Sequence, residues 1–306
     1  MGVPASVITG PLGVGKTTAI LDLMRARGEG RWAVLVNEFG QVGVDGAVLG
    51  AGGGVAVREI PGGCVCCVQG PQLQVALVRL LREVRPERLL VEPSGLAMPG
   101  AILDLLRRAG LDVRATITLV DPVRFVAGAW RDHDADHAQV DAADVLVANR
   151  CDLASEAQVA AFRAAAGALW PAPAVVAATS RGRLDPAWLD LDPTPRAPRV
   201  QILHAAPDVA ERGWVWPVDV VFDRARALAV AQAALLPDGP LGVAALRVKA
   251  VLRTRRGWLR LDGADERVEV WPFQRRTDSR LEILAPAGAA WDGVDALVRG
   301  AIDAGA

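Results

Sequence analysis

The segment from Gly10 to Thr18 constrains the fold of this chain more than any other. It reads Gly-Pro-Leu-Gly-Val-Gly-Lys-Thr-Thr and matches the pattern G-x-x-x-x-G-K-[ST]. The β-branched run Ser6–Thr9 precedes it, and apolar residues at helical spacing follow from Lys16 to Arg27. Glycines between a strand and a helix let backbone N–H groups turn inward, so the segment predicts a phosphate-binding loop.

Two side chains of this loop have predicted roles. Lys16 reaches the β- and γ-phosphates, and the Thr17 hydroxyl ligates Mg²⁺. A glycine-rich turn without a ligand is the alternative interpretation. We assign nucleotide binding to Gly10, Gly13, Val14, Gly15, Lys16, Thr17 and Thr18.

Composition narrows the function classes. The chain has 306 residues, 52% of them apolar and 23% charged, which excludes a mainly disordered protein. Its net charge of −1 argues against non-specific binding of nucleic acids or anionic membranes. No apolar run approaches the roughly 18 residues that a transmembrane helix needs, and no signal sequence is evident, so we expect a cytoplasmic protein.

Strand and helix patterns alternate from residue 1 to about residue 188. This alternation predicts a doubly wound α/β domain with a mainly parallel sheet, whose ligands bind at the carboxyl ends of the strands. A capping box at Ser155 and Gln158 marks the start of one helix. The candidate strands are Ser6–Thr9, Trp32–Asn37, Leu89–Glu92, Arg114–Val120, Val145–Asn149 and Val175–Ala178.

The pattern changes in the second part of the chain. Residues 189–200 contain three prolines and predict a linker. Residues 201–306 predict a smaller α+β domain, because their short strands cluster at hairpin spacing and form an antiparallel sheet. Pro217 places the strand Trp214–Phe222 at an edge of that sheet.

A second motif lies after the strand that begins at Val145. Asn149-Arg150-Cys151-Asp152 is similar to the N-K-x-D base-reading loop of GTPases. The Asp152 carboxylate can accept hydrogen bonds from both N1–H and the exocyclic amine of guanine. Asn149 would hold the loop together, and the Arg150 guanidinium can stack on the base. An ordinary Asn-x-x-Asp turn is the alternative.

Glu92 ends an apolar strand, and Gly95 follows three residues later. An acid at this place organises Mg²⁺, and the glycine N–H can sense the γ-phosphate. A strand-terminal glutamate in a plain turn is the alternative. The candidate catalytic residues are therefore Lys16, Thr17, Glu92 and Gly95.

Three of the four cysteines, Cys64, Cys66 and Cys67, lie within four residues. Three thiolates suit a soft divalent metal and leave a tetrahedral Zn²⁺ one ligand short. The fourth ligand can come from Glu38, from water or from a receiving protein. A redox pair or buried small side chains are the alternatives.

His133 and His137 are four residues apart. We expect this segment to be a solvated polar loop. A second metal patch, which requires the segment to be helical, is the alternative.

Taken together, these motifs resemble those of the CobW-type family of P-loop GTPases. The resemblance rests on Gly10–Thr18, Asn37–Gly40, Gly62–Cys67, Glu92–Gly95 and Asn149–Asp152, in this order. It implies GTP hydrolysis with Mg²⁺, coupled to the holding and release of Zn²⁺ or Co²⁺ for a client protein. It also implies that the smaller domain helps to select this client.

Two departures from the family bear on this implication. Gln41 stands where many relatives carry a glutamate, and no histidine-rich tract is present. Two other function classes remain open: a P-loop phosphotransferase or ATPase, and a nucleotide-gated binding module with negligible turnover.

Overall fold

The computed structural model describes residues 2–26, 30–37, 56–60, 70–195, 209–264, 266–273, 275–276 and 278–303. They form two compact units. Among the described residues, the first unit comprises 2–37 and 56–195, and the second comprises 209–303.

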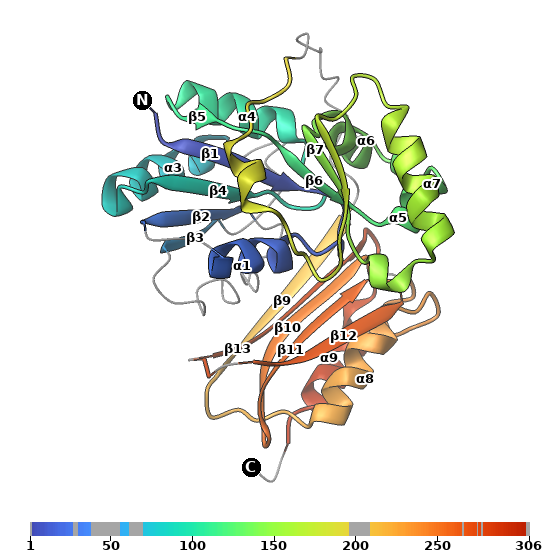
Figure 1. The fold of residues 1–306 in the computed structure, drawn as a ribbon. Helices are drawn as coiled ribbons and strands as arrows, with labels where there is room; N and C mark the ends of the chain where they lie inside the picture. The colour runs from blue at the N-terminus through green and yellow to red at the C-terminus, as the bar shows by residue number, and fades with distance from the viewer. Residues whose placement is uncertain are drawn as a thin grey trace. The chain divides into compact units, whose positions relative to one another are not determined.

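The first unit is built on an 8-stranded parallel sheet in the order β3-β2-β4-β1-β6-β7-β8, with the short β5 pairing with β1 (Figure 1). This order confirms the predicted doubly wound P-loop fold, since the strand that leads into the P-loop lies in the middle of the sheet. The strands are β1 Pro4–Thr9, β2 Trp32–Asn37, β3 Ala56–Ile60, β4 Arg88–Glu92, β5 Asp112–Val113, β6 Ile117–Val120, β7 Val145–Ala148 and β8 Val175–Ala178.

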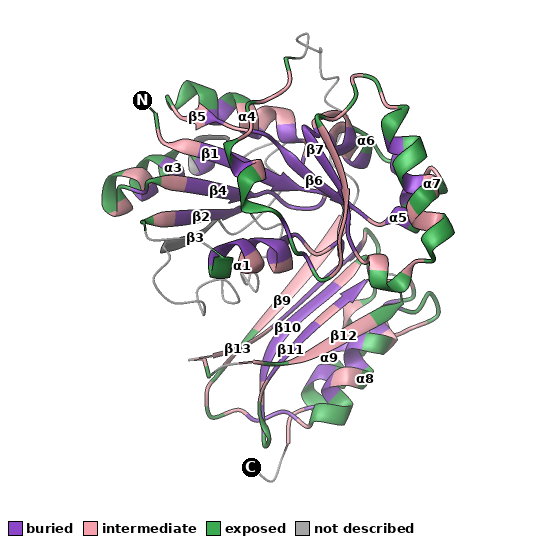
Figure 2. Ribbon diagram, in the orientation of Figure 1, coloured by how far each residue is buried: buried purple, intermediate pink, exposed green. Residues whose placement is uncertain are grey.

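Helices connect these strands and bury apolar side chains against them. Leu73, Leu77 and Leu80 of α3 pack with Ile102 of α4 into one core with β1, β2 and β4. Figure 2 shows the central strands as buried and the outer sides of the helices as exposed. The helices are α1 Lys16–Ala26, α3 Gly70–Val84, α4 Pro99–Arg108, α5 Pro122–Val126, α6 Asp134–Asp141 and α7 Glu156–Gly167, with short 3-10 helices η1 Ala129–Arg131, η2 Cys151–Leu153 and η3 Pro186–Asp190.

Local signals explain several of these boundaries. The predicted capping box is present at the start of α7, where Ser155 and Gln158 exchange side-chain and backbone hydrogen bonds. Only the second part of the predicted strand Arg114–Val120 is a strand, β6. Residues 114–116 are not in a strand, and β5 lies directly before the predicted range.

The second unit has a 5-stranded antiparallel sheet in the order β12-β11-β10-β13-β9. Helices α8 (Arg224–Ala234) and α9 (Trp291–Gly300) share a buried core with one face of this sheet. This confirms the predicted small α+β fold. β9 is an edge strand as predicted, but it begins earlier than the predicted strand Trp214–Phe222 and already ends at Pro217. The strands are β9 Val209–Pro217, β10 Arg247–Thr254, β11 Gly257–Ala264, β12 Arg267–Phe273 and β13 Asp278–Pro286.

Lys249 lies on β10 with its side chain on the face away from α8 and α9. It is 2% exposed, and its register partners are Glu282 on β13 and Asp262 on β11. Side chains directly opposite one another in an antiparallel pair have Cβ atoms about 5 Å apart. The only lysine of this unit therefore lies between two carboxylates.

Residues 185–194, here called the strap, run along the amino ends of the strands of the first unit. Arg88, at the start of β4, donates to Leu189 O over 2.9 Å and pairs with Asp190. Asp144, just before β7, accepts from Thr194 N over 2.9 Å. The strap includes most of the described part of the predicted linker, and two more contacts, Arg114 with Asp192 and Ala115 N with Leu191 O, hold it to the same unit.

No helix in the described part of the chain has the length and apolarity that crossing a bilayer requires.

Candidate functional site

The P-loop adopts a backbone that requires its glycines. Gly10 has φ 141°, Gly13 has φ 73° and Gly15 has φ 101°. A Cβ on Gly10 would lie 2.2 Å from Leu119 O, and one on Gly15 would lie 2.6 Å from Asn149 Nδ2. Side chains are therefore excluded here by both conformation and space.

Lys16 closes over this loop. Its Nζ donates to Gly10 O at 2.8 Å and to Pro11 O at 2.9 Å, and the residue is 5% exposed. The ammonium group thus lies against the backbone of the loop from which it projects, which is where phosphate oxygens would meet it.

Thr17 and Glu92 bring the loop together with the carboxyl end of β4. Thr17 Oγ1 donates to Glu92 Oε1 at 2.7 Å, and both residues are buried. A hydroxyl and a carboxylate beside a phosphate-binding loop are the oxygen donors that Mg²⁺ prefers. The residues at this place therefore fit a magnesium ion.

The turn that follows β4 packs against the P-loop. Ala97 N donates to Ser94 O at 2.9 Å, which closes a turn with Gly95 and Leu96 at its centre. A Cβ on Gly95 would lie 2.7 Å from Leu12 N. The structure therefore places Gly95 in contact with the P-loop, whereas a larger residue at 95 would separate the two segments.

Asn149 joins three segments of the site. Its Nδ2 donates to Val14 O in the P-loop at 2.9 Å, and its Oδ1 accepts from Gly182 N at 3.0 Å. The base loop is thereby attached to the P-loop and to the turn that follows β8. Arg150 has φ 62°, and Asp152 is an exposed residue of η2.

Sequence reasoning missed the turn after β8. Cys151 N donates to Thr179 O at 3.1 Å, and a Cβ on Gly182 would lie 2.7 Å from Ala19 N of α1. The turn is therefore packed between the base loop and the helix that follows the P-loop. A signal was available, since Thr-Ser-Arg-Gly directly follows the last predicted strand of the domain.

Sequence reasoning also missed Asp136 and Gln139 on α6. Gln139 donates to the turn after β4. Asp136 is 9% exposed, and burial raises the pKa of its carboxyl, while the charges of His133, Arg124 and Lys16 act to lower it. Its electrostatic interaction with Lys16 relates α6 to the P-loop.

The His133 segment is helical, so the interpretation as a polar loop is wrong. His133 is the N-cap of α6, and the ring of His137 stacks on Trp130 with centroids 5.4 Å apart. Within the described ranges, no group of three or more His, Cys, Asp or Glu residues is arranged to hold a metal ion. A second metal patch at these histidines is not supported.

The metal site predicted at the cysteine motif lies outside the described part of the chain. Cys64, Cys66, Cys67 and Glu38 fall outside the described residues. The fourth cysteine, Cys151, is a free thiol that donates to Ala148 O at 3.4 Å, and burial raises its pKa.

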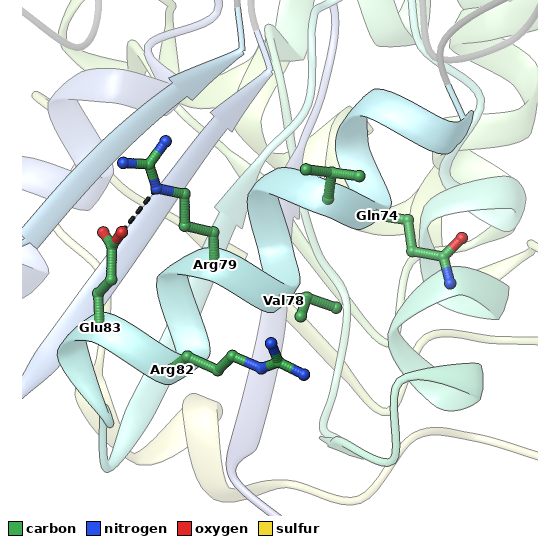
Figure 3. Close-up of a pocket in the computed structure, with 6 residues that line it drawn as sticks. Gln74, Val78, Arg79, Arg82 and Glu83 are labelled. Carbon is green, nitrogen blue, oxygen red and sulfur yellow. Dashed lines mark hydrogen bonds and ion pairs between the residues drawn. The ribbon is translucent and has the colours of Figure 1, made fainter.

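A hollow of about 460 Å³ lies along the solvent side of α3 (Figure 3). It contains none of the residues assigned to nucleotide binding. Val75 and Val78 form its apolar part, and the ion pair between Arg79 and Glu83 borders it. Its described lining consists of Gln74, Val75, Val78, Arg79, Arg82 and Glu83.

The family of this chain follows from its match to a known sequence model. Residues 4–176 match the sequence model described as CobW/HypB/UreG, nucleotide-binding domain. The chain belongs to this family. The resemblance inferred from the motifs is therefore confirmed.

Individual relatives extend this match beyond the nucleotide-binding domain. The chain is 34% identical to the zinc chaperone YeiR of Escherichia coli (strain K12), over 94% of both chains. It is 34% identical to the zinc chaperone CobW of a Sinorhizobium species, over 53% of this chain and 54% of that one.

Solved structures are more distant. Zn(II)-bound YjiA GTPase from E. coli has a TM-score of 0.42 at 19% identity, over 98% of this chain and 99% of that chain. Nickel-bound HypB from Helicobacter pylori has a TM-score of 0.45 at 18% identity, over 62% of this chain and 83% of that chain.

Proposed function

We propose that this chain is a GTP-hydrolysing metallochaperone that binds Zn²⁺ or Co²⁺ at its cysteine motif and delivers the ion to a client protein in the cytoplasm. One observation carries the nucleotide half of the proposal, namely the 2.7 Å contact between Thr17 and Glu92. Similarity to a zinc chaperone over 94% of both chains supports the metal half.

For nucleotide binding and hydrolysis, the role of each residue follows from its position around the P-loop. Backbone N–H groups from Gly10 to Thr18 hold the phosphates, and Lys16 supplies the positive charge beside them. Thr17 and Glu92 would hold Mg²⁺, which neutralises charge on the phosphate oxygens during transfer. Gly95 would contribute its N–H to the γ-phosphate at the turn after β4.

Guanine selection is assigned to the base loop. Asn149 fixes the loop through the two hydrogen bonds described above, which leaves Asp152 exposed for the base edge. Its carboxylate accepts from the two neighbouring donors of guanine, a pair that adenine lacks on this edge. Arg150 would cover one face of the base.

The proposed metal site is supported by the ends of the two strands that precede Glu38 and the cysteine motif in the sequence. β2 ends at Asn37 and β3 ends at Ile60, and these two residues are register partners in adjacent parallel strands. Glu38 directly follows the first, and the segment with Cys64, Cys66 and Cys67 follows the second. This supports a three-thiolate site with Glu38 as a candidate fourth ligand.

Metal binding and nucleotide binding must each change the affinity of the other. If the nucleotide state changes metal affinity by some factor, metal changes nucleotide affinity by the same factor. We expect hydrolysis to weaken metal binding so that the ion can be transferred, with the smaller domain selecting the client.

The decisive experiment titrates Zn²⁺, and separately Co²⁺, into protein saturated with GMPPNP or with GDP, using a chromophoric competitor. A difference of at least tenfold between the two nucleotide states is expected, since allosteric couplings are of the order of 1–3 kcal/mol. Equal affinities in the two states would sink the proposal. Incubation with GTP and Mg²⁺, followed by a search for phosphorylated products, detects a phosphotransferase instead.

A matched pair of variants locates the metal. Cys66→Ala should lose tight Zn²⁺ binding and keep GDP binding. Cys151→Ala should keep both, because the Cys151 thiol is engaged with Ala148 O and burial raises its pKa. If Cys66→Ala retains the wild-type affinity for Zn²⁺, the motif is not the metal site.

A further inference from the structure

Gln139 reaches from α6 to the turn that follows β4. Its Nε2 donates to Gly95 O at 3.0 Å and to Ala97 O at 3.0 Å. Both neighbours are carbonyl acceptors, so the network itself fixes which side of the amide carries the hydrogens. The residue has no exposed surface, and one side chain therefore holds two points of a four-residue turn.

The turn is held from two sides. Its internal bond joins Ala97 N to Ser94 O, which leaves the carbonyls of Gly95 and Ala97 for Gln139. On the P-loop side, Leu12 approaches so closely that Gly95 has no room for a Cβ. Movement of the turn away from the P-loop must either break the bonds to Gln139 or displace α6.

The backbone of Gln139 is itself anchored. Thr118 Oγ1 on β6 donates to Gln139 O at 2.9 Å, and Thr118 is the register partner of Thr9, the last residue of β1. The chain of contacts therefore runs from the strand that precedes the P-loop, through β6 and α6, to the turn that follows Glu92. Each member of this chain is buried.

The other side of the amide indicates why a glutamine is present. Gln139 Oε1 is buried and has no hydrogen-bond partner among the described residues. Leaving a buried acceptor unsatisfied costs about 1–3 kcal/mol. A methionine would remove that cost but would leave the carbonyls of Gly95 and Ala97 without the two hydrogen bonds that Gln139 donates. These two bonds to the turn therefore account for the amide at this position.

We propose that Gln139 is a positioning residue for GTP hydrolysis, which acts by holding the turn that carries Gly95 against the P-loop. The proposal rests on the proposed GTPase function and assigns a role that the nucleotide-binding motifs do not contain. Gln139 touches neither nucleotide nor metal in this mechanism, because its effect passes through the carbonyls of Gly95 and Ala97.

Two consequences separate this role from a merely structural one. Without the amide, the turn is free to move, so the γ-phosphate loses a positioned N–H while the rest of the nucleotide keeps its contacts. Turnover should then fall more than GDP affinity. The preference for GMPPNP over GDP should fall as well, because only the triphosphate reaches the turn.

The test compares Gln139→Leu with Gln158→Leu. The control removes a glutamine from the exposed capping box of α7, in the same unit and by the same substitution. For Gln139→Leu we expect a 10- to 100-fold lower kcat, since small misplacements near a reacting group cost about 10²-fold. GDP affinity should stay within about threefold and the ratio of GMPPNP to GDP affinity should fall at least fivefold, while Gln158→Leu leaves all three unchanged.

A second substitution guards against misfolding. Gln139→Glu is isosteric and replaces the two donated hydrogens with an acceptor, so it should reproduce the loss in kcat if the donors matter. Thermal melting of each variant, followed by far-UV circular dichroism, confirms that the assays use folded protein.

The outcomes are distinguishable. If either folded variant keeps kcat within twofold of wild type, or loses kcat and GDP affinity in equal proportion, Gln139 is not a positioning residue. If wild-type protein with Mg²⁺ shows no GTP turnover, the proposed function fails first and this inference fails with it.

Discussion

The hydroxyl of Thr17 lies 2.7 Å from the carboxylate of Glu92, although the two residues are 75 positions apart in the chain. The parallel pairing of β1 with β4 creates this contact, because it brings the carboxyl ends of both strands to the same edge of the sheet. The hydroxyl of Thr17 and the carboxylate of Glu92 thus form one buried set of oxygens that can ligate a metal ion.

Substitution of either predicted Mg²⁺ ligand, Thr17 or Glu92, should make the rate of GTP hydrolysis independent of Mg²⁺. Thr17→Val keeps the shape and removes the hydroxyl, and Glu92→Gln keeps the acceptor and removes the charge. Both should lower kcat for GTP hydrolysis at least about 100-fold, which corresponds to roughly 2.7 kcal/mol of transition-state stabilisation. Hydrolysis assays across a Mg²⁺ titration measure this effect. Thr116→Val, at the amino end of β6, is the matched control and should hydrolyse GTP at the wild-type rate.

Base preference should follow the residue at position 152. An amide in Asp152→Asn presents one donor and one acceptor, which suits the N1–H and C2 carbonyl of xanthine in place of the two donors of guanine. We expect a loss of about 10- to 100-fold in GDP affinity, in line with about 1.5–3 kcal/mol for hydrogen bonds to a charged group, and a gain for xanthosine diphosphate. Competition binding with both diphosphates decides the matter. Asp121→Asn, at the N-cap of α5, should leave the preference unchanged.

Asp136 should make stability depend on pH. Because burial raises its pKa in the folded state, ionisation costs more in the folded chain than in the unfolded one. The cost is absent at pH values below the ordinary aspartate pKa of about 3.9, where both states are protonated. It grows as the pH rises from there through the raised pKa of the folded state, and it is complete above that value.

Asp136→Asn should therefore melt at a higher temperature than wild type at pH 8, with the difference shrinking towards pH 4. Asp134→Asn is the control, because this exposed acid in the first turn of α6 favours the helix dipole and its loss should lower stability slightly. Thermal melting between pH 4 and pH 8 tests both variants. A gain for Asp136→Asn that does not vary with pH would contradict the assignment.

Lys249 should be required for the stability of the second unit. Its substitution by methionine leaves the buried Glu282 opposite an uncharged side chain, whereas Asp262 keeps its ion pair with Arg260. Leaving a buried charge uncompensated costs about 3–5 kcal/mol. The additional change Glu282→Met should recover part of this loss. Urea denaturation measures the free energy of unfolding, with Arg267→Met on the exposed part of β12 as the control. A loss below about 1 kcal/mol for Lys249→Met would contradict the buried pairing.

The sequence was informative wherever a short motif lay at a strand end. The sequence assigns both Thr17 and Glu92 to Mg²⁺, because each lies at the carboxyl end of a predicted strand in a mainly parallel sheet. That β1 and β4 are neighbours in this sheet is seen only in the structure. β3 was missed because Ala56–Ile60 contains Arg58 and Glu59, and a strand at a sheet edge does not need an uninterrupted apolar run.

The contacts of α6 could not be predicted for a different reason. Its sequence, Asp-Ala-Asp-His-Ala-Gln-Val-Asp, lacks apolar periodicity and resembles a polar loop. Gln139 meets Gly95, a residue 44 positions earlier, and no local pattern encodes such a contact. Only the position of α6 beside the turn after β4 shows that these polar residues face inward.

The strap has a practical consequence for the choice of boundaries when the nucleotide-binding unit is to be produced alone. A chain cut directly after β8 would leave Arg88, Arg114 and Asp144 without the partners that residues 189–194 provide at the amino ends of the strands. A chain that ends at Pro195 retains all of them. The smallest independently folding piece should therefore extend about 17 residues beyond the last strand of its sheet, and a piece cut directly after β8 should melt at a lower temperature.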